Sequence, residues 1–210
     1  LASSLRDSDQ AKIQPLLEAL PDSGNARHHT ASLRRLPSLL ENWWTERLNT
    51  LQKHATGIQA ADGRINSQAA EALLNIVEQD LVLCPRRRGP WSLDDVHRTL
   101  LGKSRHNPKQ WPTGLPVISG ANQPELGLAN GDLGVKVNVA NETRLLFRIL
   151  NDDGSTTLQL LHPSRLQAVD PAIAITSHRS QGSEASRVIL LWPPTQDTEQ
   201  RPHLEQRLLY

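Results

Sequence analysis

The sequence has one cysteine, almost no net charge, no long apolar run and no methionine. A single thiol, Cys84, cannot form an internal disulfide or a cysteine-based zinc site, so we expect a reducing compartment and a metal-free chain. The 23 basic and 22 acidic side chains leave a formal net charge of +1. This balance excludes a global field that would draw the chain to nucleic acid or anionic lipid. Any polyanion site must therefore be local.

A membrane-spanning helix needs about 20 consecutive apolar residues, and no stretch of the sequence approaches that length. The N-terminus also lacks the basic and then apolar pattern of a secretory signal. Both absences favour a cytoplasmic protein. The chain starts at Leu1 and holds no methionine among its 210 residues. We therefore expect a fragment of a longer protein with methionines omitted, which would shorten some motif spacings by one.

Helical periodicity dominates the first 80 residues. Residues 10–24 predict a short helix, residues 36–57 a longer one, and residues 66–80 a third. In the second helix the apolar side chains recur at spacings of three and four, which indicates one buried stripe. We therefore expect Trp43 and Trp44 in the core or in an interface, and not stacked on a ligand.

An arginine triplet lies between a predicted strand and a predicted helix. Residues 80–84, DLVLC, predict a short buried strand, and the triplet 86–88 follows it. Residues 91–104 then predict a helix, with Ser92 and Asp95 at the spacing of a capping box. Loops at the carboxyl ends of strands are where α/β proteins bind ligands. The triplet is therefore a candidate binding loop or, alternatively, a solvated charged face.

From residue 114 to about residue 170 the apolar period changes from helical to alternating. Residues 131–150 and the turn NDDGS after them predict a small β-rich unit of four or five short strands. This unit is inserted between α/β elements. Residues 172–176 and 187–192 predict a return to short buried strands.

A polar loop joins these last two strands. It holds Thr176, His178, Arg179, Ser180, Gln181 and Glu184 and pivots on Gly182. Thr176 or Ser177 can cap a single helical turn, which Gly182 can end with positive φ. Such a turn presents backbone N–H groups and side-chain donors toward one point, which suits a phosphate or a nucleic-acid backbone. The residues alone leave an equal alternative, a polar surface turn.

Three segments resemble one family. The run "AIAITSHRSQGSEASRVILL" at 172–191 resembles motif V of superfamily 1 DNA helicases, in the form T-x-H-[KR]-[SA]-Q-G of the RecD and Pif1-like branch. "LCPRRRGPW" at 83–91 resembles the LC-x-x-R-x-GP segment of RecD, the alpha subunit family of exodeoxyribonuclease V. "LPVISGANQPELGLANGDLGV" at 115–135 resembles its N-x-x-x-x-L-x-NGD-x-G segment. The stretch "PVISG" is one residue shorter than that pattern.

The resemblance implies an α/β fold: a second RecA-like motor domain, P-loop NTPase-like with a parallel sheet, carrying an inserted small SH3-like β-barrel and a helical N-terminal region. Residues 1–119 would form the helical region and the first part of the motor domain. Residues 120–168 would form the SH3-like insert. Residues 169–210 would complete the motor domain and include motif V.

The resemblance also implies a function: an ATP-dependent 5′-3′ DNA helicase in recombination and double-strand-break repair. Its partners would be single-stranded DNA and RecB- and RecC-like subunits, with no membrane. The residues implied at the DNA are Thr176, His178, Arg179, Ser180, Arg87 and Arg88. Those implied at the nucleotide are Gln181, Gly182 and Glu184.

Several parts of the family's ATP site are not in the sequence. It has no G-x-x-x-x-G-K-[ST] loop, and Asp94 and Asp95 fall at a helix start, where they are better explained as caps than as magnesium ligands. The family's motif IV is expected upstream of Leu1 and its motif VI beyond Tyr210. ATP and Mg²⁺ are therefore expected in the full-length protein, with no cofactor on the fragment. No complete set of catalytic residues or metal ligands is present, so the fragment alone should not hydrolyse ATP.

Two alternatives to a helicase are a Ser/His hydrolase and a non-catalytic assembly module. Ser177, His178 and Ser180 are too close along one turn to form a nucleophile and base pair, and no G-x-S-x-G elbow accompanies them. A non-catalytic assembly module is the stronger alternative, in which the insert and the helical region contact partner subunits of a nuclease-helicase complex.

Overall fold

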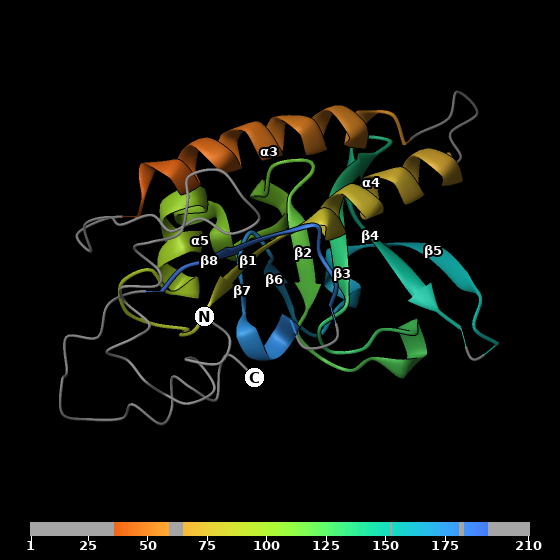
Figure 1. The fold of residues 1–210 in the computed structure, drawn as a ribbon. Helices are drawn as coiled ribbons and strands as arrows, with labels where there is room; N and C mark the ends of the chain where they lie inside the picture. Colours follow the sequence, from red (N-terminus) through yellow and green to blue (C-terminus); the bar gives the residue numbers. More distant parts are fainter. Residues whose placement is uncertain (1–35, 59–64, 152, 181–182, 193–210) are drawn as a thin grey trace.

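Two sheets of opposite kinds form the centre of the structure (Figure 1), a computed structural model that describes residues 36–58, 65–151, 153–180 and 183–192. The first is a three-stranded parallel sheet in the order β7-β1-β8, and the second is a five-stranded antiparallel sheet in the order β5-β4-β3-β2-β6. The strands are β1 (Asp80–Cys84), β2 (Pro116–Ser119), β3 (Leu133–Val139), β4 (Glu142–Leu150), β5 (Thr156–Leu161), β6 (Val169–Pro171), β7 (Ile175–Thr176) and β8 (Arg187–Leu190).

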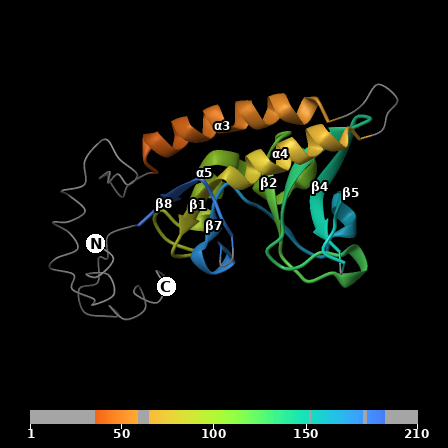
Figure 2. The same ribbon diagram turned by 45° about the vertical axis from the view of Figure 1, so that its right-hand side comes forward.

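Helix α3 (Ser38–Thr56) packs against two hydrophobic clusters. Its N-terminal half, with Leu40 and Trp44, packs in the same cluster as Val82 of β1, whereas its C-terminal half, with Leu51, packs in the cluster that contains Val135 of β3. Figure 2 shows α3 and α4 (Ser67–Gln79) on one side of the molecule, with the strands beneath them. The helices predicted over 36–57 and 66–80 are confirmed, and the one predicted over 10–24 lies outside the described residues.

Helix α5 (Leu93–Leu101) follows β1 and covers the parallel sheet. The Ser92 side chain caps it by accepting the Asp95 backbone N–H at 3.3 Å, while the Asp95 carboxylate accepts the Trp91 N–H at 3.0 Å. This is a variant of the predicted capping box, because the reciprocal bond reaches one residue further back. The strand DLVLC is confirmed over the predicted residues. Short 3-10 turns, η1 (Gly102–His106) and η2 (Pro108–Gln110), then lead to β2.

The antiparallel sheet confirms the predicted β-rich unit. The register runs from Gly134↔Phe147 between β3 and β4 to Val117↔Pro171 between β2 and β6. Gly134 is required at its position, because a Cβ there would stand 2.6 Å from the Leu146 carbonyl oxygen and from the Phe147 ring. Strands β5 and β6 form the two edges, and no pairing between them is seen within the described residues.

Strand β8 corrects one expectation. The run 187–192 was predicted to be a buried strand, but Val188 is 53% exposed and Leu190 is 43% exposed. Strand β8 pairs only with β1 among the described residues, and its side chains alternate between two faces. Ile189 packs on the main core, whereas Val188 and Leu190 face away from it. None of the described helices combines the length and the apolar content that crossing a membrane requires.

Candidate nucleic-acid interface

Two polar loops leave the parallel sheet at the same edge. Strands β1 and β7 run parallel, with Leu83 opposite Ile175 and Cys84 opposite Thr176. Both strands therefore end side by side. The arginine loop, residues 85–90, begins directly after Cys84, and the 3-10 turn η5 (Ser177–Ser180) begins directly after Thr176. Sequence segments about 90 residues apart thus meet at the carboxyl edge, where α/β sheets bind their ligands.

Turn η5 is the single helical turn that the sequence predicts. Ser180 Oγ donates to the Ser177 carbonyl oxygen at 2.8 Å, and the Ser183 N–H donates to the Ser180 carbonyl at 2.9 Å. Thr176 is half-buried at the end of β7, while His178 is exposed to solvent. Gln181 and Gly182 lie outside the described residues. The turn therefore exposes His178 at the carboxyl edge, and hydrogen bonds among its serines stabilise the backbone of the turn.

Arg179 is not directed freely to solvent. Its Nη1 lies 3.4 Å from Asp170 Oδ2 on β6, and its side chain is 21% exposed. Glu184, which the resemblance places at the nucleotide, is exposed after the turn. The structure thus brings Thr176, His178, Arg179 and Ser180 together on one turn. It pairs Arg179 with a carboxylate that the sequence does not single out.

The arginine loop is fixed through its backbone and exposed through its side chains. The carbonyl oxygens of Arg86 and Arg87 accept the N–H groups of Leu93 and Asp94, each at 3.1 Å. These bonds satisfy two of the orphan donors at the start of α5 and attach the loop to the helix. Arg88 lies 4.0 Å from Asp94 with 93% of its side chain exposed, so this ion pair contributes little. Arg87 and Arg88 are therefore displayed to solvent from a fixed loop.

A buried histidine ties the same edge to α5. His97 is 6% exposed, and its Nε2 accepts the backbone N–H of Ala174, two residues before Thr176, at 3.4 Å. Burial lowers the pKa of His97 to about 4, with the carboxylates of Asp170 and Asp94 partly opposing this shift. A neutral imidazole therefore holds the strand that leads into η5. Sequence reasoning missed His97, although it shares the apolar helical stripe of Leu93 and Val96.

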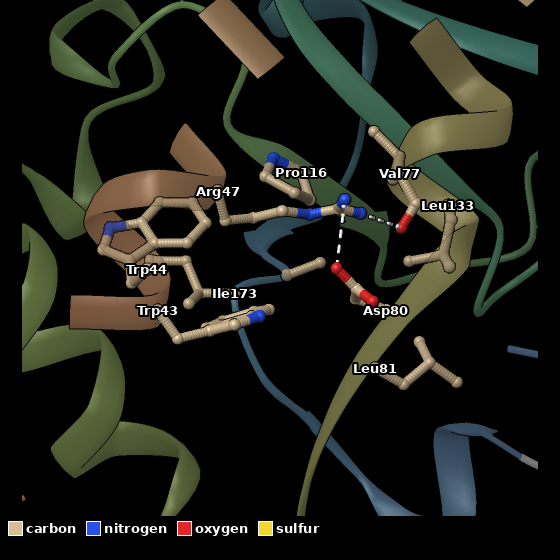
Figure 3. A pocket seen from close by; sticks show the side chains of 10 residues that line it. Trp43, Trp44, Arg47, Val77, Asp80, Leu81, Pro116, Leu133 and Ile173 are labelled. Carbon is tan, nitrogen blue, oxygen red and sulfur yellow. Dashed lines mark hydrogen bonds and ion pairs between the residues drawn. The ribbon is translucent and has the colours of Figure 1, made fainter. Parts of the chain in front are cut away.

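At the opposite, amino edge of the parallel sheet, two arginines contact one aspartate, and Figure 3 shows the contact between Arg47 and Asp80. Asp80 Oδ2 lies 3.0 Å from Arg47 Nη1, and Arg187 reaches both Asp80 oxygens at 2.9 and 2.8 Å. Arg47 also donates to the carbonyls of Ile76 and Val77 in the last turn of α4. Burial lowers the pKa of Arg47, while the hydrogen bond to Asp80 raises that of Arg187.

The tryptophan pair lies beside this cluster, as the prediction of a core or interface position requires. Trp44 is 5% exposed, and its ring centroid lies 6.3 Å from that of Trp43. Trp43 lines a cavity of about 10 Å³ next to Arg47 and Asp80, roughly the space of one water. Its Nε1–H is buried and finds no hydrogen-bond partner among the described residues.

Nothing in the described ranges gathers into a metal site, because no three His, Cys, Asp or Glu side chains lie together there. Asp95 is engaged with the Trp91 N–H and, at 2.5 Å, with Arg98, so it acts as a cap as predicted. Asp94 is exposed at the first turn of α5 and lies beside Arg88.

Comparisons with known proteins agree on one group. A family model described as the UvrD-like helicase C-terminal domain matches residues 171–210. The RecBCD enzyme subunit RecD of Mycolicibacterium smegmatis is 36% identical over 128 residues, which are 59% of this chain and 22% of that protein. The RecD subunit of Mycobacterium tuberculosis H37Rv is 30% identical over 147 residues, 68% of this chain and 24% of its own. The chain therefore spans less than a quarter of these curated relatives.

Solved structures of Pif1 helicases also match. A Bacteroides Pif1 in complex with ADP-AlF3 and single-stranded DNA is 15% identical, with a TM-score of 0.37 over 87% of this chain and 48% of that one. A structure of two Pif1 helicases coordinating at forked double-stranded DNA is 16% identical, with a TM-score of 0.31 over 75% and 41%.

Proposed function

Because the chain carries the C-terminal region of a RecD-like superfamily 1 helicase, we propose that it supplies the second motor domain of an ATP-dependent 5′-3′ DNA helicase. The whole protein would act in recombination and double-strand-break repair, in the cytoplasm, with RecB- and RecC-like subunits as partners. One observation supports this most strongly. The arginine loop and turn η5 leave neighbouring parallel strands at one carboxyl edge, so two cationic segments can face the same strand of DNA.

The single-stranded DNA would lie along this edge. Arg87 and Arg88 would pair with backbone phosphates, since their side chains are exposed on a loop whose backbone is fixed. Thr176 at the end of β7 and His178 on η5 would donate to the same strand, and Ser180, whose hydroxyl donates to the Ser177 carbonyl, would hold the turn in place beside them. These donors need no base-specific geometry, so we expect affinity without strong sequence preference.

The nucleotide would lie between this domain and a first motor domain, with Gln181, Gly182 and Glu184 on its near side. ATP hydrolysis would supply the free energy for stepping along DNA. Neither a phosphate-binding loop in the sequence nor a magnesium site in the described residues is present. We therefore propose that this chain alone binds DNA without hydrolysing ATP and that Mg-ATP belongs to the full-length protein.

Strands β3, β4 and β5 of the antiparallel sheet would form the SH3-like insert of this motor domain. In this proposal residues 120–168 form the insert, and the flanking segments 1–119 and 169–210 belong to the helical region and the motor domain. Strands β2 and β6 lie just outside those bounds and attach the insert to the parallel sheet through β7.

A second candidate, the assembly module, draws support from the apolar side chains left at the surface. Leu39 on α3 and both Val188 and Leu190 on β8 are more than two-fifths exposed. Isolated exposed apolar residues are common, but Val188 and Leu190 lie on β8, an edge strand of the parallel sheet among the described residues, which a partner subunit could cover.

A DNA-binding titration separates the two candidates. Fluorescence anisotropy of a labelled oligothymidine of about 15 nucleotides would be measured at about 50 and about 200 mM salt. The Arg87→Ala, Arg88→Ala double variant should bind more weakly. The slope of log K against log salt concentration should become less steep by roughly 1 to 1.5. The control Lys53→Ala, Arg144→Ala double variant removes the same charge from α3 and β4. It should leave the DNA affinity and its salt dependence nearly unchanged. Equal behaviour of the two double variants, or no salt-dependent binding by the wild type, would contradict the DNA role and favour assembly.

A further inference from the structure

The ion pair between Arg179 and Asp170 joins the two sheets at the proposed DNA edge. Asp170 lies on β6 opposite Ile118 of β2, so it belongs to the antiparallel sheet. Arg179 lies on turn η5 after β7 of the parallel sheet. A cation that the family resemblance implies at the DNA is thus already paired with a carboxylate of this chain.

The geometry of this pair is that of a replaceable contact. It rests on one nitrogen-oxygen distance of 3.4 Å, with side chains that are 21% and 48% exposed. By contrast, Arg187 contacts both oxygens of Asp80 at 2.9 and 2.8 Å, and Asp80 is 7% exposed. Single, partly solvated ion pairs contribute little, and a competing anion can displace them.

The backbone beneath Arg179 is braced, so an exchange of partners needs only rotation of its side chain. The Ser180 hydroxyl and the Ser183 N–H close the turn, and Thr176 pairs with Cys84 at its base. A guanidinium pairs with a carboxylate and with a phosphate through the same N–H donors. Carboxylate and phosphate can therefore alternate on Arg179 while the turn stays in place.

We propose that Asp170 is an internal substitute for a DNA phosphate, which holds Arg179 when no DNA is bound and releases it to the backbone of single-stranded DNA. Asp170 is then a positioning residue that lowers DNA affinity. Its release also uncouples β6 of the antiparallel sheet from η5 each time DNA binds. This inference rests on the proposed function, because it assumes that the carboxyl edge contacts DNA.

The test compares Asp170→Asn with Asp153→Asn by anisotropy on the same labelled oligothymidine. Both variants remove one negative charge, but Asp153 lies in the turn between β4 and β5 and, within the described part of the chain, hydrogen-bonds to Ser155. We expect Asp170→Asn to bind about 2- to 5-fold more tightly, the range expected when a weak competing ion pair is lost. Asp153→Asn should bind as the wild type does. Asp170→Glu keeps the charge and should restore the wild-type affinity.

Arg179→Ala supplies the second arm. Because one phosphate contact is lost, the slope of log K against log salt concentration should become less steep by roughly 0.7. Adding Asp170→Asn to Arg179→Ala should then leave the DNA affinity unchanged. Tighter binding by Asp170→Asn that persists without Arg179, or no difference from Asp153→Asn, would overturn the exchange. If the wild type binds with a salt dependence that Arg179→Ala leaves unaltered, the exchange fails while the proposed function stands. Absence of salt-dependent wild-type binding would overturn both. Thermal unfolding of each variant verifies that its fold is intact.

Discussion

The charged side chains at the two ends of the parallel strands differ in how they are paired and how exposed they are. At the amino edge, Asp80 is held by Arg47 and by both forks of Arg187, in a site where Asp80 is 7% exposed. At the carboxyl edge, Arg179 and Asp170 share a single, half-exposed contact, and Arg87 and Arg88 lie in solvent. Buried, fully paired charges fix a fold, whereas weakly paired, accessible ones can be exchanged with a ligand. The charged side chains at the amino edge are thus paired with one another, whereas those at the carboxyl edge remain accessible to a ligand.

The largest effect that would test this contrast is loss of Asp80. Asp80→Ala leaves Arg47 buried without its counter-ion, and breaking one partner of a buried pair costs about 3 to 5 kcal/mol of unfolding free energy. Urea unfolding followed by circular dichroism measures this. As a control, Asp170→Asn at the other edge should cost less than about 1 kcal/mol. Similar losses from both substitutions would mean that the two edges do not differ in the way described.

Acid should loosen the carboxyl edge through His97. Its pKa is about 4 in the folded chain and 6.5 in an unfolded one, so the unfolded chain binds more protons between these values. Stability contributed by the neutral ring is therefore complete above pH 6.5, falls as the pH drops from 6.5 toward 4, and is lost below that. This lowering of the folded-state pKa corresponds to a loss of about 3 kcal/mol.

Unfolding by urea at several pH values measures this, with His97→Gln as the matched variant. The glutamine oxygen can still accept the Ala174 N–H but does not titrate in this range. The variant should therefore lose less stability than the wild type between pH 6.5 and pH 4. Parallel pH profiles would show that other groups dominate the acid response.

Local features of the fold could be predicted because their signals lie within a few residues. Helical period, the strand DLVLC and the Ser92 cap depend on neighbours in sequence, and the structure confirms them. The grip on Asp80 could not be predicted in this way, because Arg47 and Arg187 are 33 and 107 residues away from it.

The candidate site divides along the same line. The turn after Thr176 was predictable from the local sequence and the resemblance, and Ser180 Oγ donates to the Ser177 carbonyl within it. The partner of Arg179, by contrast, depends on how the antiparallel sheet packs against the turn. The prediction that β8 is buried is wrong, because Val188 and Leu190 are exposed. An apolar run indicates that burial is favourable, but it does not show whether neighbouring elements pack against both faces of the strand.

The smallest expected effect concerns the cap that anchors the arginine loop. Ser92→Ala removes the acceptor for the Asp95 N–H and should cost about 1 kcal/mol of unfolding free energy. The carbonyls of Arg86 and Arg87 still accept from the first turn of α5, so the loop should stay attached and DNA affinity should change less than twofold. Ser67→Ala at the start of α4, where Asn66 is the cap, is the control and should be nearly neutral. A large loss of DNA binding in Ser92→Ala, with the unfolding free energy unchanged, would contradict this expectation. It would show that the cap, and not the backbone hydrogen bonds of Arg86 and Arg87, sets the position of the arginine side chains.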